Sequence, residues 1–234
     1  MEKTELLNSF IDFLKNKLST ELYSAVLFGS AAENRIRANS DINLLVVLNS
    51  SSLATLDKIK SEYRDHHNLI HLSCLFIERS ELDQVCQTFP LKFYDISKRN
   101  QIVAGANIIP EIKIDPANLK FQLKQSLMNL TMRLRERYTF VSLREEQLVH
   151  IMNEFSGPLR TNAFSLVSLQ GESAKNPKEA LNIFLKKYFP DRAEQLSETI
   201  STIRESSTLS KNQIEPTYQA YLEILKKMQN VLGT

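Results

Sequence analysis

The chain has 234 residues, of which 42% are hydrophobic, and this is enough to bury one large core or two smaller ones. Residues 1–115 carry 13 basic and 15 acidic side chains, and residues 116–234 carry 16 and 12. This slight basic excess falls short of the dense basic face that nucleic-acid binding requires. A nucleic acid is therefore not an expected partner. No run of 18 apolar residues occurs, so a membrane is not an expected partner either.

Two cysteines, Cys74 and Cys86, lack the CxxC spacing of redox and zinc motifs, and we expect them to be buried free thiols. Free thiols are typical of a reducing compartment, which predicts a cytoplasmic protein. The first residues mix charged and apolar side chains at helical spacing, unlike the continuous apolar core of a signal peptide.

The first half of the chain alternates helical and strand patterns. An amphipathic helix is expected over residues 3–19, followed by a strand over 23–28 that ends at Gly29-Ser30. Glycine permits a tight turn there, and Ser30 is a suitable cap for a following helix. A nearly continuous apolar run predicts a buried strand over residues 42–48.

Further elements are expected as a helix at 53–66, a strand at 70–77 and a helix at 80–87 with Ser80 as its N-cap. In the third strand, His71 and Ser73 should face away from the apolar side. Phe89-Pro90 then breaks the helical pattern. This order predicts a sheet with helices packed on it.

From Pro116 onward the apolar positions advance by three or four residues, and no strand pattern recurs. Four or five helices are expected, with breaks near 140–143, 157–158, 171–177, 190 and 206–216. The fold class is therefore α+β, and the boundary between its two domains should lie within residues 109–116.

Phosphate chemistry suits the junction of the first two strands. Backbone N–H groups and a hydroxyl at Gly29-Ser30 can hold phosphates, and Asp41, before the second strand, offers a hard oxygen ligand for Mg²⁺. Residues two apart on a strand share a face, so position 43 should point into the same cleft as Asp41. That position holds Asn43, and the second carboxylate of a two-metal site is therefore replaced by an amide.

The pattern Gly29-Ser30, nine residues, then Ser40-Asp41-Ile42-Asn43 before LLVVL resembles the nucleotidyltransferase superfamily, the DNA polymerase beta-like group that includes aminoglycoside and minimal nucleotidyltransferases. A wider resemblance, to a bacterial subgroup of uncharacterised nucleotidyltransferases, extends through residues 89–107 and the basic helix at 118–138.

The resemblance implies a nucleotidyltransferase-like mixed sheet over residues 1–112 and a helical bundle over 113–234. It implies transfer of a nucleoside monophosphate from Mg-NTP to a hydroxyl of a small molecule or protein. The resemblance is also compatible with a homo-oligomer. The assigned residues are Gly29, Ser30 and Ser40 for the nucleotide, Asp41 and Asn43 for catalysis, and Asp41, Asn43 and His71 for the metal.

The chain also departs from the family pattern. Glu33-Asn34 stands in place of Arg-Gly, Lys92 in place of a glutamate, and Asn43 in place of the second acid. No third acid occurs within residues 70–77. An alternative is therefore a catalytically impaired member that acts as a nucleotide sensor or a protein-interaction module. His71 is alternatively a structural strand histidine, and Asp95 is expected to be a hydrogen-bonded structural carboxylate.

Overall fold

The computed structural model describes residues 3–33, 41–141 and 145–233. They form two compact units, Met1–Asp115 and Pro116–Thr234. The first unit contains the sheet and the second contains helices, so the α+β class is confirmed. The boundary of two domains at residues 112 and 113 stays a prediction.

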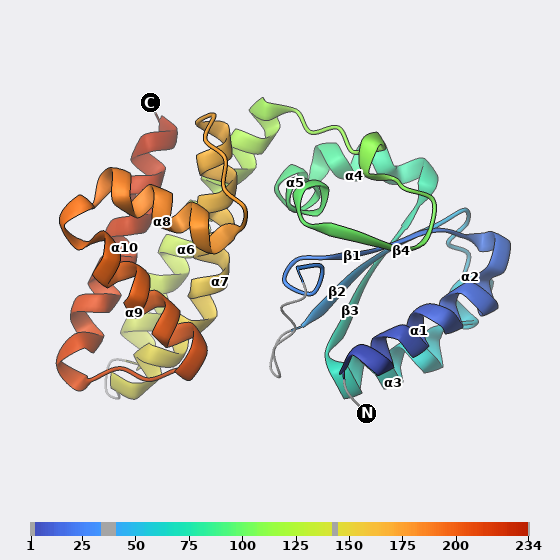
Figure 1. The fold of residues 1–234 in the computed structure, drawn as a ribbon, viewed down its shortest axis with the longest axis horizontal. Helices are drawn as coiled ribbons and strands as arrows, with labels where there is room; N and C mark the ends of the chain where they lie inside the picture. The colour runs from blue at the N-terminus through green and yellow to red at the C-terminus, as the bar shows by residue number, and fades with distance from the viewer. Residues whose placement is uncertain (1–2, 34–40, 142–144, 234) are drawn as a thin grey trace. The chain divides into compact units, whose positions relative to one another are not determined.

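A mixed sheet of four strands forms the centre of the first unit (Figure 1). The strands are β1 (Leu22–Phe28), β2 (Ile42–Leu48), β3 (Leu72–Glu78) and β4 (Asn100–Gly105), in the order β3-β2-β1-β4. β2 and β3 run parallel, whereas β1 is antiparallel to both of its neighbours. The end of β1 therefore lies beside the beginnings of β2 and β4.

Helices cover both faces of this sheet, as Figure 1 shows. On one face, α1 (Lys3–Leu18) and α3 (Lys60–Ile70) contribute to a core with Leu44 and Val46 of β2. On the other, α4 (Leu82–Thr88) and α5 (Pro90–Lys98) contribute to a core with Leu45 and Val47. Because both faces are covered, β2 is apolar almost throughout rather than alternating with polar residues.

Several element boundaries differ from the sequence-based expectations. The helix expected at 53–66 is two helices, α2 (Leu53–Asp57) and α3. His71 adopts a left-handed conformation with φ +55° and ends α3, so Ile70 is helical and β3 begins at Leu72. α4 follows a 3-10 turn, Arg79–Glu81, whose capping box is made by Glu78 and Glu81 instead of by Ser80.

The strand β4 was not expected from the sequence, because the segment that follows Phe89-Pro90 has no clear alternation. Pro90 instead begins α5, where its lack of a backbone N–H costs nothing in the first turn. The chain then returns along β1 as β4, with Phe28 opposite Asn100. Pairing with β1 therefore decides the conformation of this segment.

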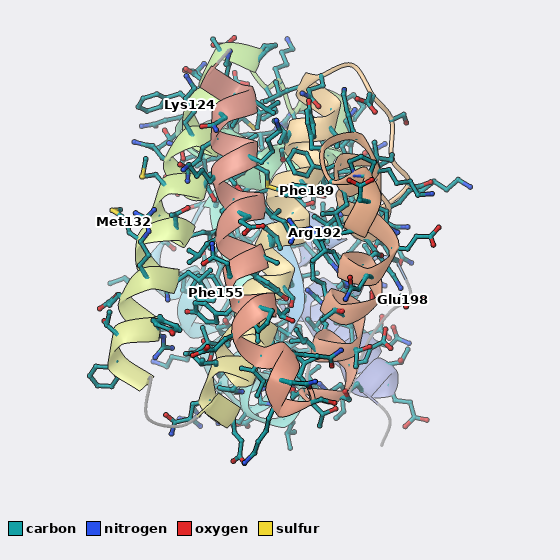
Figure 2. The ribbon with its side chains drawn as sticks, turned by 90° about the vertical axis from the view of Figure 1, so that its left-hand side faces the viewer. Lys124, Met132, Phe155, Phe189, Arg192 and Glu198 are labelled. Carbon is teal, nitrogen blue, oxygen red and sulfur yellow. The ribbon has the colours of Figure 1, made fainter. Side chains whose placement is uncertain are left out.

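The second unit consists, over its described residues, of α6 (Pro116–Val141), α7 (Glu145–Leu169), α8 (Pro177–Tyr188), α9 (Ala193–Ser206) and α10 (Lys211–Gly233). The break expected at Gly157-Pro158 is wrong, because α7 continues through Pro158. α10 likewise continues through Pro216. Figure 2 shows Phe155 inside this bundle and Met132 pointing away from it. Among the described helices, none has the length and apolar character needed to cross a membrane.

Buried hydrogen bonds join the helices of the second unit. The hydroxyls of Ser156 in α7 and Tyr221 in α10 are hydrogen-bonded to each other at 2.8 Å. The Tyr218 hydroxyl donates a hydrogen bond to the carbonyl of Leu134 in α6. Burial raises the pKa of Tyr221 to about 12, so its hydroxyl keeps its proton at neutral pH. α10 is thus tied to α6 and α7 by polar contacts within an apolar core.

Candidate functional site

The turn after β1 begins at Gly29, which has a φ of +73°. This left-handed conformation favours glycine, because a side chain would crowd its own backbone. The Gly29 N–H donates to the Arg99 carbonyl at 3.2 Å, and the Glu33 N–H donates to the Ser30 carbonyl at 3.3 Å. Residues 29–33 form a turn rather than the first turn of a helix, so the expected helix capped by Ser30 does not begin there.

Asn43 lies beside this turn. It is the second residue of β2, opposite Phe28 of β1 and in register with Ser73 of β3. A β-carbon added to Gly29 would be 3.9 Å from Asn43 Nδ2, an ordinary van der Waals distance. The Asn43 amide and the Gly29 turn therefore face each other, as strand alternation and chain reversal require.

Other predicted site residues lie at the same end of the sheet. Asp41 is exposed and immediately precedes β2. His71 is exposed at the end of α3, and its carbonyl accepts the N–H of Ile42 at 3.1 Å. Ser73, also exposed, follows at the start of β3. We call the following set the polar end of the sheet: Gly29, Ser30, Asp41, Asn43, His71 and Ser73. Ser40 lies outside the described residues.

The donor set of the polar end fits one kind of Mg²⁺ binding. Mg²⁺ is commonly held by one or two carboxylates together with the phosphates of the substrate and water. In such a site Asp41 would supply one carboxylate and Asn43 an amide oxygen. Within residues 3–33, 41–141 and 145–233, no three His, Cys, Asp or Glu side chains group as metal ligands. The residues therefore suit a single ion that arrives with a triphosphate, whereas two ions would require more carboxylates.

The imidazole of His71 is a less suitable ligand for Mg²⁺ than a carboxylate, because Mg²⁺ prefers oxygen. Its assignment as a metal ligand stays a prediction, as do the roles of Asp41 and Asn43. His71 also has a structural part, since its carbonyl bonds the first residue of β2.

A largely buried ion-pair network lies next to the polar end. Arg99 donates from Nε and Nη2 to the two carboxylate oxygens of Asp95, each at 2.7 Å. Its Nη1 lies 3.6 Å from a carboxylate oxygen of Glu33, in the turn. The side chains of Arg99, Asp95 and Glu33 are only 10%, 13% and 18% exposed. Burial raises the pKa of Asp95, and the adjacent Arg99 guanidinium opposes that rise.

The Asp95–Arg99 pair agrees with the expected structural role of Asp95, but the part played by Arg99 was missed in the sequence. Asp95 lies within α5, and Arg99, four residues later, follows its last residue. This spacing indicates a helical ion pair. Their contact with Glu33 has no local signal, because it forms only when β4 pairs with β1.

Comparisons with known proteins agree with this fold. Residues 7–102 match the family model described as nucleotidyltransferase domain. The fold is similar to that of spectinomycin adenyltransferase AAD(9) from Enterococcus faecialis, solved with ATP and spectinomycin, with a TM-score of 0.66 and 13% sequence identity. The alignment covers 99% of each chain. The search of curated proteins found no significant match.

Proposed function

Because residues 7–102 match a nucleotidyltransferase domain, we propose that this protein binds a nucleoside triphosphate at the polar end of the sheet and transfers its nucleoside monophosphate to a hydroxyl group. The acceptor is a small molecule or a protein. The observation that carries this proposal is the left-handed Gly29 turn facing Asn43 and adjoining Asp41, at one end of the sheet.

In the proposed reaction, Ser30 contacts the phosphates through its backbone N–H and its hydroxyl, and Gly29, whose own N–H donates to the Arg99 carbonyl, lets the phosphates approach the turn without meeting a side chain. Asp41 and Asn43 would hold Mg²⁺, which neutralises phosphate charge when it is bound. The acceptor oxygen forms a bond to the α-phosphorus, the bond between the α- and β-phosphates breaks, and pyrophosphate leaves. The hydroxyl proton passes to solvent or to a base, which we do not assign to a residue. Ser40 and His71 stay predicted members of this site.

A second candidate is a catalytically impaired protein of this fold that acts as a nucleotide sensor or as a protein-interaction module. Asn43 favours it, because replacing a carboxylate by an amide removes one negative charge that would attract a divalent cation. The Glu33 carboxylate also favours it, because it stands in the turn where the related family has Arg-Gly and pairs with Arg99.

Binding and transfer are separated by two measurements. Calorimetry with ATP, GTP, CTP and UTP, each with and without Mg²⁺, reports binding. Incubation with labelled nucleotide and a panel of hydroxyl acceptors reports transfer; the panel includes spectinomycin, because a protein of this fold was solved with it. Binding with transfer supports the proposed enzyme, and binding alone supports a nucleotide sensor. The absence of both contradicts the enzyme and the sensor and leaves the protein-interaction module.

Two substitutions assign the residues. Asp41→Ala should abolish Mg²⁺-dependent binding and transfer, whereas Asp57→Ala, which removes an exposed carboxylate of α2, should leave both unchanged. Asn43→Asp should raise metal-dependent transfer, because it adds the second carboxylate. Asn129→Asp, an exposed change in α6, is its control. Equal activity of wild type and Asp41→Ala would remove Asp41 from the site.

A further inference from the structure

Arg99 contacts the Gly29–Glu33 turn at both of its ends. At the first end, its backbone carbonyl accepts the Gly29 N–H at 3.2 Å. At the other, its guanidinium Nη1 lies 3.6 Å from the Glu33 carboxylate. The turn is closed between these two points by the bond from the Glu33 N–H to the Ser30 carbonyl. One residue of the α5–β4 junction thus bridges the whole turn.

Arg99 is itself held in place by hydrogen bonds to Asp95 of α5. Its Nε and Nη2 each donate to a carboxylate oxygen of Asp95 at 2.7 Å, and its backbone N–H donates to the Asp95 carbonyl at 2.9 Å. The next residue, Asn100, donates from Nδ2 to the carbonyls of Ile96 and Ser97 at 2.9 and 3.2 Å. α5 in turn packs on the sheet through Phe93 and Ile96. These contacts, none of which involves the turn, fix the position of the guanidinium relative to the sheet.

Net stability alone does not account for such a network. Removing an ion pair from water costs about as much as the charges regain by attraction, so a buried pair often adds little to the free energy of unfolding. A planar fork does, however, define the position of its partners in a way that a lysine ammonium cannot. The network is better suited to placing the turn than to strengthening the fold.

We propose that Arg99 is a positioning residue that holds the Gly29–Glu33 turn in the conformation that receives the nucleotide phosphates. This inference rests on the proposed function. Phosphate binding by backbone N–H groups requires their directions to be set, and ordering a loose turn on binding would cost conformational entropy for each residue. Arg99, held by Asp95 and reaching Glu33, orders the turn beforehand.

The test compares Arg99→Lys and Glu33→Gln with a control, Arg192→Lys. The control removes a guanidinium from a half-exposed ion pair, since Arg192 donates from Nη2 to Glu223 at 2.8 Å in the second unit. The first measurement is amide hydrogen exchange of the segment that contains residues 29–33, in the nucleotide-free protein. The second is Mg-ATP affinity by calorimetry, well below the unfolding temperature of every variant.

We expect Arg99→Lys to speed exchange of the turn amides and to weaken Mg-ATP binding, each by about tenfold, as the loss of one charged hydrogen bond implies. Glu33→Gln should change both in the same direction and by less, and Arg192→Lys should change neither. Affinity measured on folded protein would not move if Arg99 only stabilised the fold. Unchanged exchange and affinity in Arg99→Lys would overturn the proposal.

The two levels of inference fail in different ways. If wild type binds no nucleotide but Arg99→Lys still loosens the turn, the proposed function is wrong and the placement of the turn by Arg99 stands. If wild type binds Mg-ATP and Arg99→Lys binds equally well, the positioning role is wrong and the proposed function stands. If Arg99→Lys does not fold, Glu33→Gln decides the matter, because it leaves the Arg99–Asp95 fork in place.

Discussion

Gly29 and Gly171 share a left-handed backbone, with φ of +73° and +78°, but of these two only Gly29 belongs to the polar end of the sheet. Neither position is crowded, since an added β-carbon would meet Asn43 at 3.9 Å in one case and open space in the other. Replacement of either by alanine therefore introduces backbone strain without a clash.

We predict that Gly29→Ala and Gly171→Ala each lower the free energy of unfolding by about 1–2 kcal/mol. Only Gly29→Ala should weaken Mg-ATP binding, because it shifts the turn that receives the phosphates. Urea unfolding and calorimetry measure the two effects. A strained but fully binding Gly29→Ala protein would show that the turn conformation does not matter for the nucleotide.

The two cysteines are predicted to be unreactive in the folded protein. Burial raises the pKa of the Cys86 thiol to about 11 from a usual value of 9.0, with the nearby Asp83 adding to the rise. Burial also raises the pKa of Cys74 far above its ordinary range. Both are free thiols, as the sequence predicts, but only Cys86 is buried as expected, whereas Cys74 is partly exposed.

Reaction of Cys86 with a disulfide reagent at pH 8 should be about a hundredfold slower in native protein than in urea, because the thiolate fraction is that much smaller. The native rate should rise as pH approaches 11. The same pKa rise means that the thiol's contribution to stability is present below pH 9 and is lost as pH rises through 11. A fast native reaction at pH 8, assigned to Cys86 with a Cys74→Ala variant, would contradict this.

At the scale of elements, α8 shows how local sequence sets a helix start. Asn176 accepts the Glu179 N–H at 3.0 Å, the Glu179 carboxylate accepts the Lys175 N–H, and Pro177 occupies the first helical position. These residues satisfy backbone groups that the helix leaves without partners. The break that the sequence predicts before Pro177 is confirmed for this reason.

Asn176→Ala should lower the free energy of unfolding by about 1 kcal/mol, because the cap is lost. Asn176→Asp should retain most of it, since a carboxylate can accept the same N–H. The urea midpoint at unchanged slope measures the difference. If alanine and aspartate proved equally stable, the capping bond would contribute nothing measurable.

Other elements show where local patterns are insufficient. Proline predicts a break at Gly157-Pro158, yet α7 continues, because the helix buries Phe155 and Leu159 on either side of the exposed Pro158. The Asn162 side chain donates to the Pro158 carbonyl at 2.8 Å within the helix. A local penalty of a few kcal/mol is thus outweighed by burial of a long apolar face.

At the scale of the whole molecule, each compact unit has apolar cores of its own. We predict that residues 1–115 and 116–234 fold when they are produced separately. Circular dichroism should show mixed secondary structure in the first fragment and helix in the second, and both should unfold cooperatively. Non-cooperative unfolding of either fragment would mean that its core depends on the other unit.

The sequence by itself determined the α+β class, the buried strand at 42–48 and the Gly29-Ser30 turn. These features depend on the periodic spacing of apolar residues and on the backbone conformations that single residues can adopt. Both properties can be read from a short segment of sequence. The position of Asn43 beside that turn followed from strand alternation, although the roles of Asp41 and Asn43 in binding and catalysis stay predictions.

Only the tertiary structure decided that residues 100–105 form a strand and that Arg99 joins Asp95 to Glu33. Glu33 and Arg99 lie far apart in the chain, and no local period relates them. They meet because β1 and β4 pair with Phe28 opposite Asn100. Contacts of this kind depend on the free energy of the assembled sheet and its cores, which no short segment of sequence contains.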